Sequence, residues 1–213
     1  MKNIELDKIY NIDAVRLLRK INNNFVDLFL TDIPYEKVNK KTNGLRILDK
    51  GDANEKSFSL ISFLKETDRV TRGSGYIFCG KEQISKIFQF FSDKGYTTRL
   101  IIWEKTNPSP MNAQYNWMSG IETCVYFKKP KATFNEHYKN CVIKFPNGRS
   151  KIHPTEKPLK LFEYLIKVSS NQGDIVCDPC VGSGTTALAS FIQGRHFIVG
   201  DINKKMAPLY KTS

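Results

Sequence analysis

The chain has 213 residues, 40% of them hydrophobic, which suits one globular domain and leaves no room for a second full one. Lys and Arg outnumber Asp and Glu by 33 to 21, and the net charge of +12 favours a polyanionic partner such as nucleic acid, although a merely basic soluble protein has the same balance. The five cysteines are scattered, so we expect no disulfides. No apolar run approaches the ~18 residues of a membrane span, and the first ten residues lack a signal-peptide apolar region. We therefore expect a cytoplasmic protein that is neither anchored nor exported.

Seven short runs rich in β-branched and aromatic residues predict strands. The runs are residues 8–12, 25–31, 75–79, 99–105, 122–128, 174–178 and 196–201. Helical patterns lie between several of them. Strands that alternate with helices in this way predict an α/β fold with a largely parallel sheet that is covered on both faces.

Helices are indicated where apolar residues recur every three or four positions. This spacing is present in the segments 84–91 and 161–168. Pro158 suits the first turn of the later helix, and Gly194 can close a further helix that begins near Thr185.

Two segments fit neither pattern. Residues 36–57 are polar and charged and predict a long mobile loop of the kind that often serves function. Residues 128–152 mix lysines with aromatic residues and predict a small insertion beside the sheet. Between residues 128 and 157, eight Lys or Arg residues stand against two Glu, which favours phosphate contacts, although a solvated basic loop has the same composition.

Residues 178–186 (DPCVGSGTT) stand where a buried strand turns into a helix. Glycines at such a turn let the backbone approach a ligand, and the N–H groups at the helix start favour a negatively charged group. The next strand ends in Asp201, about 20 residues after the glycines, where a carboxylate can bind ribose hydroxyls. No lysine follows the glycines, which disfavours a phosphate-binding P-loop. These features favour an adenosine-containing cofactor over a purely structural turn.

Residues 32–35 (DIPY) directly follow the apolar run that ends at residue 31. Asp32 offers an acceptor carboxylate, Pro34 a rigid backbone and Tyr35 a stacking face, and these parts suit a planar base with an amino group. An ordinary turn at a strand end has a similar composition, so this segment is not decisive alone.

Three segments of the chain resemble motifs of the amino-group DNA methyltransferases, which modify N6 of adenine or N4 of cytosine. Residues 32–35 resemble the Asp-Pro-Pro-Tyr catalytic motif, and residues 178–186 the Asp-Pro-Phe-x-Gly-Ser-Gly-Thr-Thr cofactor motif. Residues 153–158 (HPTEKP) are similar to the His-Pro-Thr-x-Lys-Pro segment that precedes it. The catalytic motif comes first and the cofactor motif last, which is the order of the permuted β group. The strands at 75–80 and 101–108 also resemble the family's middle strands.

The resemblance implies a seven-stranded Rossmann-like sheet that binds S-adenosylmethionine, in a single catalytic domain over residues 1–213. Its cofactor segment would be Asp178, Pro179, Gly182, Ser183, Gly184 and Thr185. Within this segment, Asp178 and the glycine turn would line the methionine end. Asp201 would hold the ribose, and Thr155 and Lys157 would help to close the pocket. No metal is implied.

The resemblance also assigns roles in the catalytic motif. The Asp32 carboxylate and the Ile33 carbonyl would accept hydrogen bonds from the target amino group, beside Pro34, while Tyr35 stacks on the flipped-out base. Two acceptors favour a pyramidal nitrogen whose lone pair is aimed at the sulfonium methyl for in-line transfer. Ile33 stands where the family usually has Pro, which keeps the carbonyl but adds an N–H and loses a rigid ring. Asp201 stands where Glu is more usual.

The expected activity is site-specific methylation of N6 of adenine in DNA, since Asp at the first motif position is the family's tendency for adenine. Methylation of N4 of cytosine uses the same geometry and remains an alternative, as does a DNA- or cofactor-binding protein impaired at Ile33. An RNA or protein amide methyltransferase would usually have the opposite motif order.

DNA is the partner that the resemblance implies, with a homodimer and a cognate restriction endonuclease as further candidates. Residues 128–152 would form a small target-recognition element. We expect the loop 36–57 to order over the flipped base or the DNA backbone.

Two cysteines invite other interpretations. Cys180 follows a proline, as the nucleophile of cytosine-C5 methyltransferases does, and it forms a C-x-x-C pair with Cys177. Its place inside the glycine turn favours packing over covalent catalysis, and no second ligand pair accompanies the two cysteines as a metal site would require.

Overall fold

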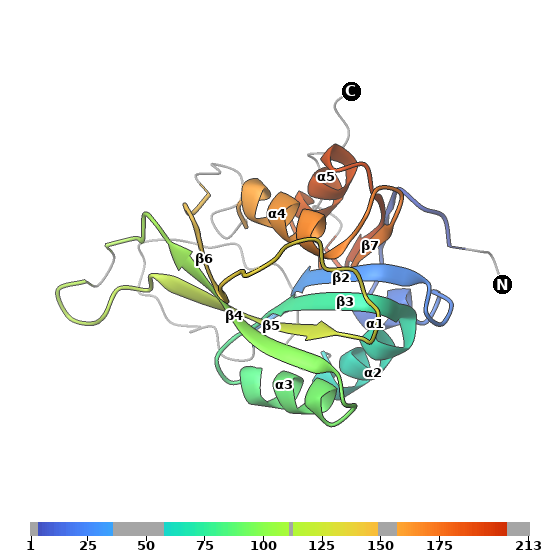
Figure 1. Cartoon of the computed structure of the whole chain (residues 1–213), viewed down its shortest axis with the longest axis horizontal. Coiled ribbons are helices and arrows are strands. Elements are labelled where there is room, and N and C mark those ends of the chain that lie inside the picture. The colour runs from blue at the N-terminus through green and yellow to red at the C-terminus, as the bar shows by residue number, and fades with distance from the viewer. Residues whose placement is uncertain (1–3, 36–57, 111–112, 149–156, 204–213) are drawn as a thin grey trace.

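The computed structural model describes residues 4–35, 58–110, 113–148 and 157–203, and the strands in these ranges form one eight-stranded sheet (Figure 1). In chain order the strands are β1 (Lys8–Asn11), β2 (Val26–Asp32), β3 (Thr71–Phe78), β4 (Thr97–Lys105), β5 (Ile121–Lys128), β6 (Val142–Phe145), β7 (Ile175–Asp178) and β8 (His196–Asp201). Their order across the sheet is β1-β8-β7-β2-β3-β5-β4-β6. β5 is antiparallel to β3 and β4, and every other described pair is parallel, which confirms the largely parallel sheet.

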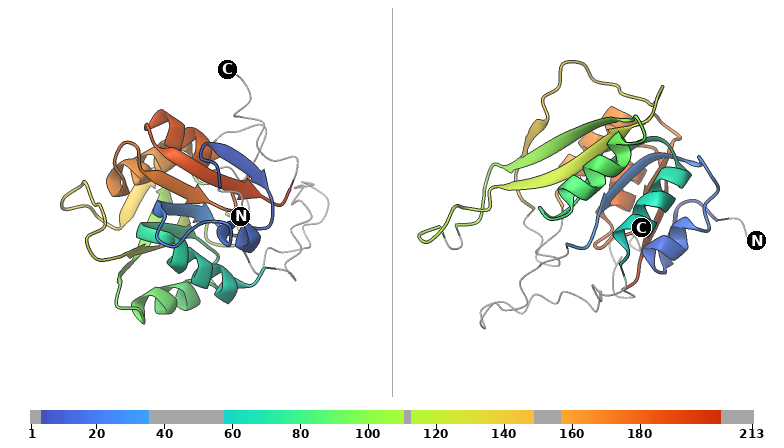
Figure 2. Two further views of the ribbon diagram at one scale, coloured as in Figure 1. Left: turned by 90° about the vertical axis from the view of Figure 1, so that its right-hand side faces the viewer. Right: turned by 90° about the horizontal axis from the view of Figure 1, so that it is seen from below.

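Helices cover both faces of this sheet, as the alternation of strands and helices predicts (Figures 1 and 2). One face carries α1 (Ala14–Leu18), α2 (Leu60–Val70) and α3 (Ile84–Ser92), and the other carries α4 (Leu159–Ser169) and α5 (Thr185–Ile192). Each face has its own buried core, so neighbouring residues of β2 serve different cores: Phe29 packs into the first and Leu30 into the second. Burial on both sides explains why β2 reads as a continuous apolar run. In the described ranges no helix is long and apolar enough to cross a membrane.

The seven predicted strands are all present, but the prediction of seven is one too few. The additional strand is β6, which lies inside the segment 128–152 and extends the sheet by pairing in parallel with β4. It has four residues that alternate between exposed and half-buried positions at the sheet edge. Pairing with β4, rather than a strong apolar pattern of its own, makes this segment a strand. The predicted loop 36–57 lies outside the described residues.

The predicted helices at 84–91 and 161–168 are confirmed as α3 and α4. Pro158 directly precedes α4 instead of lying within its first turn. Gly194 follows α5 with φ of +70°, a left-handed conformation that suits glycine at the end of a helix.

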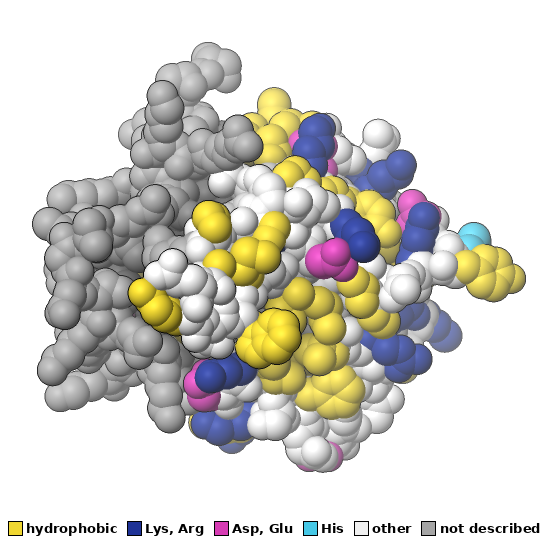
Figure 3. All heavy atoms as spheres, turned by 90° about the vertical axis from the view of Figure 1, so that its left-hand side faces the viewer, with side chains coloured by type: hydrophobic (Ala, Val, Ile, Leu, Met, Phe, Trp, Pro, Cys, Tyr) yellow, Lys and Arg dark blue, Asp and Glu magenta, His cyan; other side chains and the backbone are white. Residues whose placement is uncertain are grey.

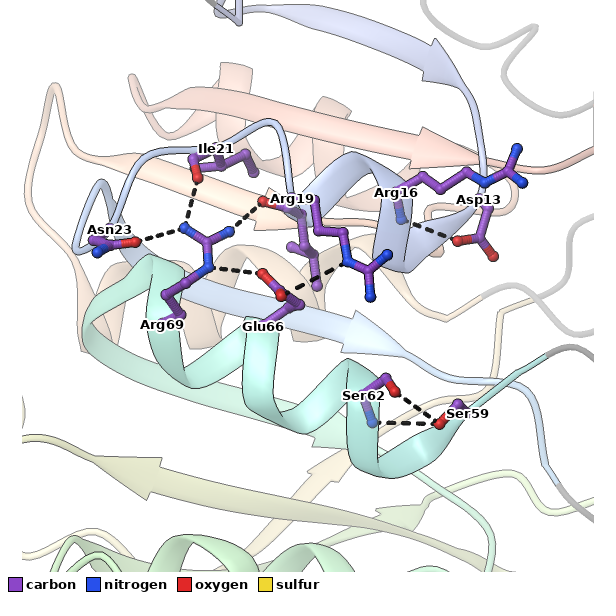
Figure 4. A network of polar contacts seen from close by, with 10 residues as sticks. Asp13, Arg16, Arg19, Ile21, Asn23, Ser59, Ser62, Glu66 and Arg69 are labelled. Atoms are coloured by element: carbon purple, nitrogen blue, oxygen red, sulfur yellow. Dashed lines mark hydrogen bonds and ion pairs between the residues drawn. The ribbon is translucent and has the colours of Figure 1, made fainter.

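Arg69, in the last turn of α2, joins that helix to α1 (Figure 4). Its guanidinium donates to the carbonyls of Leu18 and Ile21 at 2.8 and 2.9 Å, to Asn23 Oδ1 at 2.7 Å and to Glu66 Oε2 at 2.7 Å. Arg69 thus binds the carbonyl of Leu18, the last residue of α1, and that of Ile21 in the turn that follows the helix.

We expect Arg69→Ala to lower the free energy of unfolding by about 2 kcal/mol, because it removes charge-assisted hydrogen bonds to the Leu18 and Ile21 carbonyls and to Asn23. Urea denaturation followed by circular dichroism measures the change. Arg16, an exposed arginine on α1, provides the control, and its replacement by Ala is expected to change stability by less than about 0.5 kcal/mol. Equal effects of the two substitutions would contradict this role of Arg69.

Candidate active site

Three acidic residues end neighbouring parallel strands at one edge of the sheet. β8 ends at Asp201, β7 at Asp178 and β2 at Asp32, and these strands are adjacent in the order β8-β7-β2. The crevice outside the carboxyl ends of the strands is where open α/β sheets bind ligands. The sheet therefore brings the predicted catalytic motif, from the start of the chain, beside the predicted cofactor motif, from its end.

Asp178 is buried at this edge and links the two motifs. Its carboxylate accepts hydrogen bonds from Thr31 Oγ1 at 2.7 Å, from Thr186 Oγ1 at 2.5 Å and from the Cys180 N–H at 3.0 Å. Thr31 is the residue before Asp32, so the first of these bonds joins the ends of β2 and β7. Burial raises the pKa of Asp178 from its usual 3.8 to about 7, although the three donors act in the opposite direction.

This raised pKa gives a prediction for stability against pH. Between about pH 4 and pH 7 the folded chain holds a proton on Asp178 that the unfolded chain releases, so the free energy of unfolding is expected to fall as the pH rises through this window and to level off above it. In Asp178→Asn, which keeps the shape and an acceptor oxygen, that part of the slope disappears. Urea denaturation of both proteins across the window is the measurement, and identical slopes would refute the assignment.

The glycine turn after β7 meets the end of β8. The Gly182 N–H donates to Asp201 Oδ2 at 3.0 Å, and the Asn203 N–H donates to Asp201 Oδ1 at 2.8 Å. Gly182 and Gly184 have φ of +52° and +96°, which L side chains rarely adopt. A Cβ added to either glycine would meet no atom of the described residues within 4 Å, so those residues leave space beside the backbone of this turn.

The remaining residues of the predicted cofactor segment are buried under the turn. Pro179, Ser183 and Thr185 are all buried, and the hydroxyls of Ser183 and Thr185 lie 3.0 Å apart. They therefore support the turn, while Gly182 and Asp201, both half-buried, form its outer side.

The predicted catalytic motif continues the line of β2 beyond Asp32. The Ile33 N–H donates to the Phe78 carbonyl at 3.1 Å, and the Ile33 side chain is 2% exposed. The extra N–H at this position thus extends the pairing of β2 with β3, which a proline could not do. Among the described residues, no hydrogen bond reaches the Ile33 carbonyl.

Gln83 holds the next residue of the motif. Its amide donates to the Pro34 carbonyl at 2.9 Å, and its Oε1 accepts from the Gly80 N–H at 2.9 Å. Gln83 is fully buried just before α3, so it fixes the segment after β2 to the segment after β3. The sequence reasoning assigned no role to this residue, because a single glutamine at a helix start has no distinctive pattern.

Asp32 forms an ion pair with Lys157. Lys157 Nζ lies 2.5 Å from Asp32 Oδ2 and 2.9 Å from Glu122 Oε2, and it stands over the rings of Tyr35 and Phe78. Asp32 Oδ1, in contrast, is buried and has no hydrogen-bond partner in the described part of the chain. The structure therefore places Lys157 against the catalytic motif, whereas Thr155, the other residue expected to close the cofactor pocket, lies outside the described residues.

Burial and these charges compete in setting the ionisation of the cluster. Burial raises the pKa of Asp32, and Lys157 opposes that rise. Burial would also raise the pKa of Glu122, but its lysine neighbours outweigh burial and lower it. The pKa of Lys157, which burial would lower, is raised by Asp32 and the other acidic neighbours. The pKa of the Tyr35 hydroxyl is raised by burial and by the Asp32 charge.

Lys105 and Glu122 also belong to this edge, although the sequence reasoning gave neither a site role. Lys105 ends β4, Glu122 is the second residue of β5, and Lys105 Nζ lies 2.8 Å from Glu122 Oε1. The strand of Lys105 is one of those that resemble the family's middle strands, whereas the strand of Glu122 is predicted from its β-branched and aromatic residues alone. A charged residue at the end of an otherwise apolar strand is the signal that could have identified each of them.

The two cysteines of the C-x-x-C pair are both free thiols. Burial, together with the charges of Asp178 and Asp201, raises the pKa of Cys180 well above its usual value, which disfavours the thiolate that a nucleophile needs. Across the described ranges, no group of three His, Cys, Asp or Glu side chains is arranged to hold a metal ion.

The hairpin between β4 and β5 projects from the side of the sheet that Figure 3 views, and hydrophobic side chains are spread across that face among lysines and arginines. The most exposed aromatic residues of the hairpin are Tyr115 and Trp117, at 82% and 96%. β6 pairs with the end of β4 that leads into the hairpin, so Lys144 lies on the hairpin side of the sheet. The start of the basic insertion lies at the other end of the strands, where Lys128 pairs with Thr97 and Lys129 Nζ lies 3.0 Å from Asp68 Oδ1.

Comparisons with known proteins agree with this geometry. The DNA methylase family (N6_N4_Mtase) matches residues 26–212. Type II methyltransferase M.HpaI from Haemophilus parainfluenzae is 31% identical over 93% of this chain and 71% of its own length. Type II methyltransferase M2.DpnII from Streptococcus pneumoniae is 26% identical over 91% of this chain and 84% of its own.

Two solved structures have the same fold. The M1.HpyAVI–SAM complex superposes with a TM-score of 0.70 at 29% identity, covering 93% of this chain and 94% of that one. The PvuII DNA methyltransferase, which is cytosine-N4-specific, superposes with a TM-score of 0.72 and covers 92% of this chain and 82% of that one. Its sequence identity is 18%, so this similarity supports the fold alone. The sheet is thus that of the S-adenosylmethionine-dependent DNA methyltransferases, with eight described strands in place of seven, and the chain belongs to the N6/N4 DNA methylase family.

Proposed function

We propose that the protein transfers a methyl group from S-adenosylmethionine to the N6 amino group of adenine in a short DNA sequence. The observation that carries the proposal is the carboxylate of Asp32: one oxygen is held by Lys157, and the other is buried, without a partner among the described residues, at the edge where the glycine turn and Asp201 also lie. A buried acceptor without a donor is costly unless a ligand supplies one. An amino group on a base is a donor of the right kind.

The chemistry requires two acceptors at the target nitrogen. An aromatic amine is a poor nucleophile because its lone pair is delocalised into the ring. Asp32 Oδ1 and the Ile33 carbonyl, the latter without a hydrogen bond in the described ranges, would accept the two amino hydrogens and localise the lone pair. Tyr35 would stack on the base once it leaves the helix, as enzymes that modify bases require.

The residues at the carboxyl ends of β7 and β8 fit the cofactor. The described residues leave space beside the backbone of Gly182 and Gly184, where a ligand can approach closely. Within the described ranges, each oxygen of the Asp201 carboxylate accepts one hydrogen bond, which leaves lone pairs for ribose hydroxyls. We propose that Asp178 and this turn line the methionine end and that Thr155 helps to close the pocket. S-adenosylmethionine supplies a methyl group activated by a sulfonium.

A pair of glycine variants tests the cofactor site. Gly184→Ala would place a methyl group in the space beside the turn that we assign to S-adenosylmethionine. If this methyl group costs the bound cofactor about 1.4 kcal/mol, the affinity for S-adenosylmethionine falls tenfold. Gly173→Ala is the matched control, because Gly173 also has a positive φ and open surroundings but lies before the amino end of β7, away from the site. Isothermal titration with S-adenosylmethionine measures both. We expect about tenfold weaker binding for Gly184→Ala and less than about twofold for the control; equal losses would mean that only backbone strain is involved.

DNA would lie across the side of the molecule that carries the hairpin and the basic insertion. Lys144 on β6, whose side chain is 65% exposed, would contact phosphates and help to position the duplex, and the exposed aromatic rings of the hairpin can contact unstacked bases. We therefore propose residues 128–152 as a small target-recognition element. Because the relatives are type II methyltransferases, a cognate endonuclease and a second copy of the chain are the further partners that we propose.

Analysis of nucleosides is the direct test. The protein is incubated with S-adenosylmethionine and unmethylated genomic DNA, and the digested nucleosides are examined by mass spectrometry. N6-methyladenine is the expected product. N4-methylcytosine would keep the mechanism and change the target base, and unmodified DNA after long incubation would favour a binding protein without catalysis.

A further inference from the structure

Four charged side chains form a continuous line from the outer strands of the sheet to the candidate catalytic carboxylate. In order they are Lys105, Glu122, Lys157 and Asp32. The successive ion-pair distances are 2.8, 2.9 and 2.5 Å. The four residues come from the end of β4, the start of β5, the segment before α4 and the end of β2, so no local sequence pattern connects them.

The middle members of this line are well shielded from water. The side chains of Lys105 and Lys157 are 12% and 9% exposed, and that of Glu122 is 22% exposed. Charges in such surroundings are tolerated when each has an opposite charge in contact, and removing one member leaves its neighbour uncompensated. The alternation of signs makes the line neutral as a whole. Glu122 is its central anion, because it alone contacts both lysines.

The line has a geometric consequence for Asp32. Lys157 occupies Oδ2, and the carboxylate is thereby held with Oδ1 free. A lysine ammonium sits on a flexible four-carbon stem and does not by itself fix an orientation. Contact with Glu122 on one side and Asp32 on the other restricts the ammonium to the position between the two carboxylates.

We propose that Glu122, held by Lys105, is a positioning residue that fixes the Lys157 ammonium on Asp32 Oδ2 and so presents Oδ1 to the amino group of the target base. The proposal rests on the function proposed above. It gives Lys157 a place beside the catalytic carboxylate, and it assigns roles to two residues on strands β4 and β5 that lie outside the catalytic and cofactor motifs.

Without Glu122, the geometry of Asp32 would relax. The line would carry a net positive charge, and Lys105 and Lys157 would face each other without the anion that separates them. Lys157 would then have one ionic partner in place of two, and the simplest relief is for its ammonium to leave the buried position. Asp32 would lose both its fixed orientation and the cation that favours its charged form.

The test compares Glu122→Gln with Glu163→Gln. Glu163 is also a poorly exposed carboxylate with a single lysine partner, but it lies on α4 and outside the line. We expect Glu122→Gln to lower kcat by roughly 10- to 100-fold with unchanged affinity for S-adenosylmethionine, because misplacement of about 1 Å near reacting groups can cost 100-fold. Lys105→Met is expected to act in the same direction, and it keeps the test available if Glu122→Gln does not fold.

The titration of Asp32 is a readout that does not depend on activity. It is measured from the 13C resonance of the Asp32 carboxyl group against pH, in the protein without DNA or cofactor. The resonance is assigned by its absence from the spectrum of Asp32→Asn. The ionisable groups that act on Asp32 are Lys157, Glu122, Tyr35, Asp178, Cys79, Cys124 and Cys180. The charge of Lys157 lowers the pKa of Asp32, and that of Glu122 raises it. Loss of Lys157 from its position therefore moves the pKa up, whereas loss of the Glu122 charge alone moves it down.

The outcomes separate the two proposals. A higher pKa of Asp32 in Glu122→Gln, with an acid limb of kcat/KM displaced to higher pH, supports the positioning role. A lower pKa would mean that Lys157 stays in place without Glu122, and no change would mean a merely structural role; either result overturns the inference. If the wild-type protein methylates no base while the pKa still moves up, the inference about Asp32 stands and the proposed function fails.

Discussion

Asp32→Ala is expected to lower the rate of methyl transfer by at least about 100- to 1000-fold, the range typical for loss of one preorganised electrostatic contact to a reacting group. The substitution removes the buried Oδ1 acceptor and the partner of Lys157 together. The target amino group would then keep only the Ile33 carbonyl, and its lone pair would stay delocalised in the ring. Single-turnover transfer of labelled methyl to DNA measures the effect without the influence of product release.

The control for Asp32→Ala is binding of S-adenosylmethionine, which is expected to remain within about twofold of wild type because Asp178, Asp201 and the glycine turn are untouched. Asp32→Asn keeps the shape and one acceptor oxygen, and should retain more activity than the Ala variant. An Asp32→Ala protein that binds cofactor and methylates DNA at the wild-type rate would rule out Asp32 as the acceptor.

Gly73→Ala is expected to lower the free energy of unfolding by about 3 kcal/mol or more. A Cβ at this position would lie 2.0 Å from the backbone carbonyl oxygen of Asp27, and a backbone atom inside a sheet cannot move aside as a side-chain tip can. Gly73 lies on β3 beside the irregularity in the pairing of β2 with β3 between Val26 and Leu28. Close approach of the two strands, not an unusual φ, therefore explains why glycine stands here.

Gly120→Ala is the matched control for Gly73→Ala. A Cβ at Gly120 would come no closer than 3.8 Å to another described residue, and this glycine has no positive φ. Its replacement is expected to change stability by less than about 0.5 kcal/mol in the same urea denaturation experiment. Similar losses for both variants would show that the loss of glycine itself, rather than the clash with Asp27, is responsible.

Much of the local structure is determined by the sequence alone. The seven predicted strands contain enough β-branched and aromatic residues to be identified without tertiary information, and α3 and α4 follow from their apolar spacing. β6 escaped this reasoning because only its pairing with β4 makes it a strand. The family was recognisable as well, since the motifs at 32–35 and 178–186 are contiguous and occur in an informative order.

What the tertiary structure decided is which of these segments meet. Asp32 and Asp178 lie 146 positions apart in the chain (178 minus 32), and they become neighbours because β7 pairs with β2. The hydrogen bond of Gln83 to the Pro34 carbonyl and the line from Lys105 to Asp32 depend on the strand order in the same way. Contiguous motifs are visible in a sequence because chain connectivity holds their residues together, whereas contacts between distant residues come from the order in which buried strands pair, which no local pattern of residues encodes.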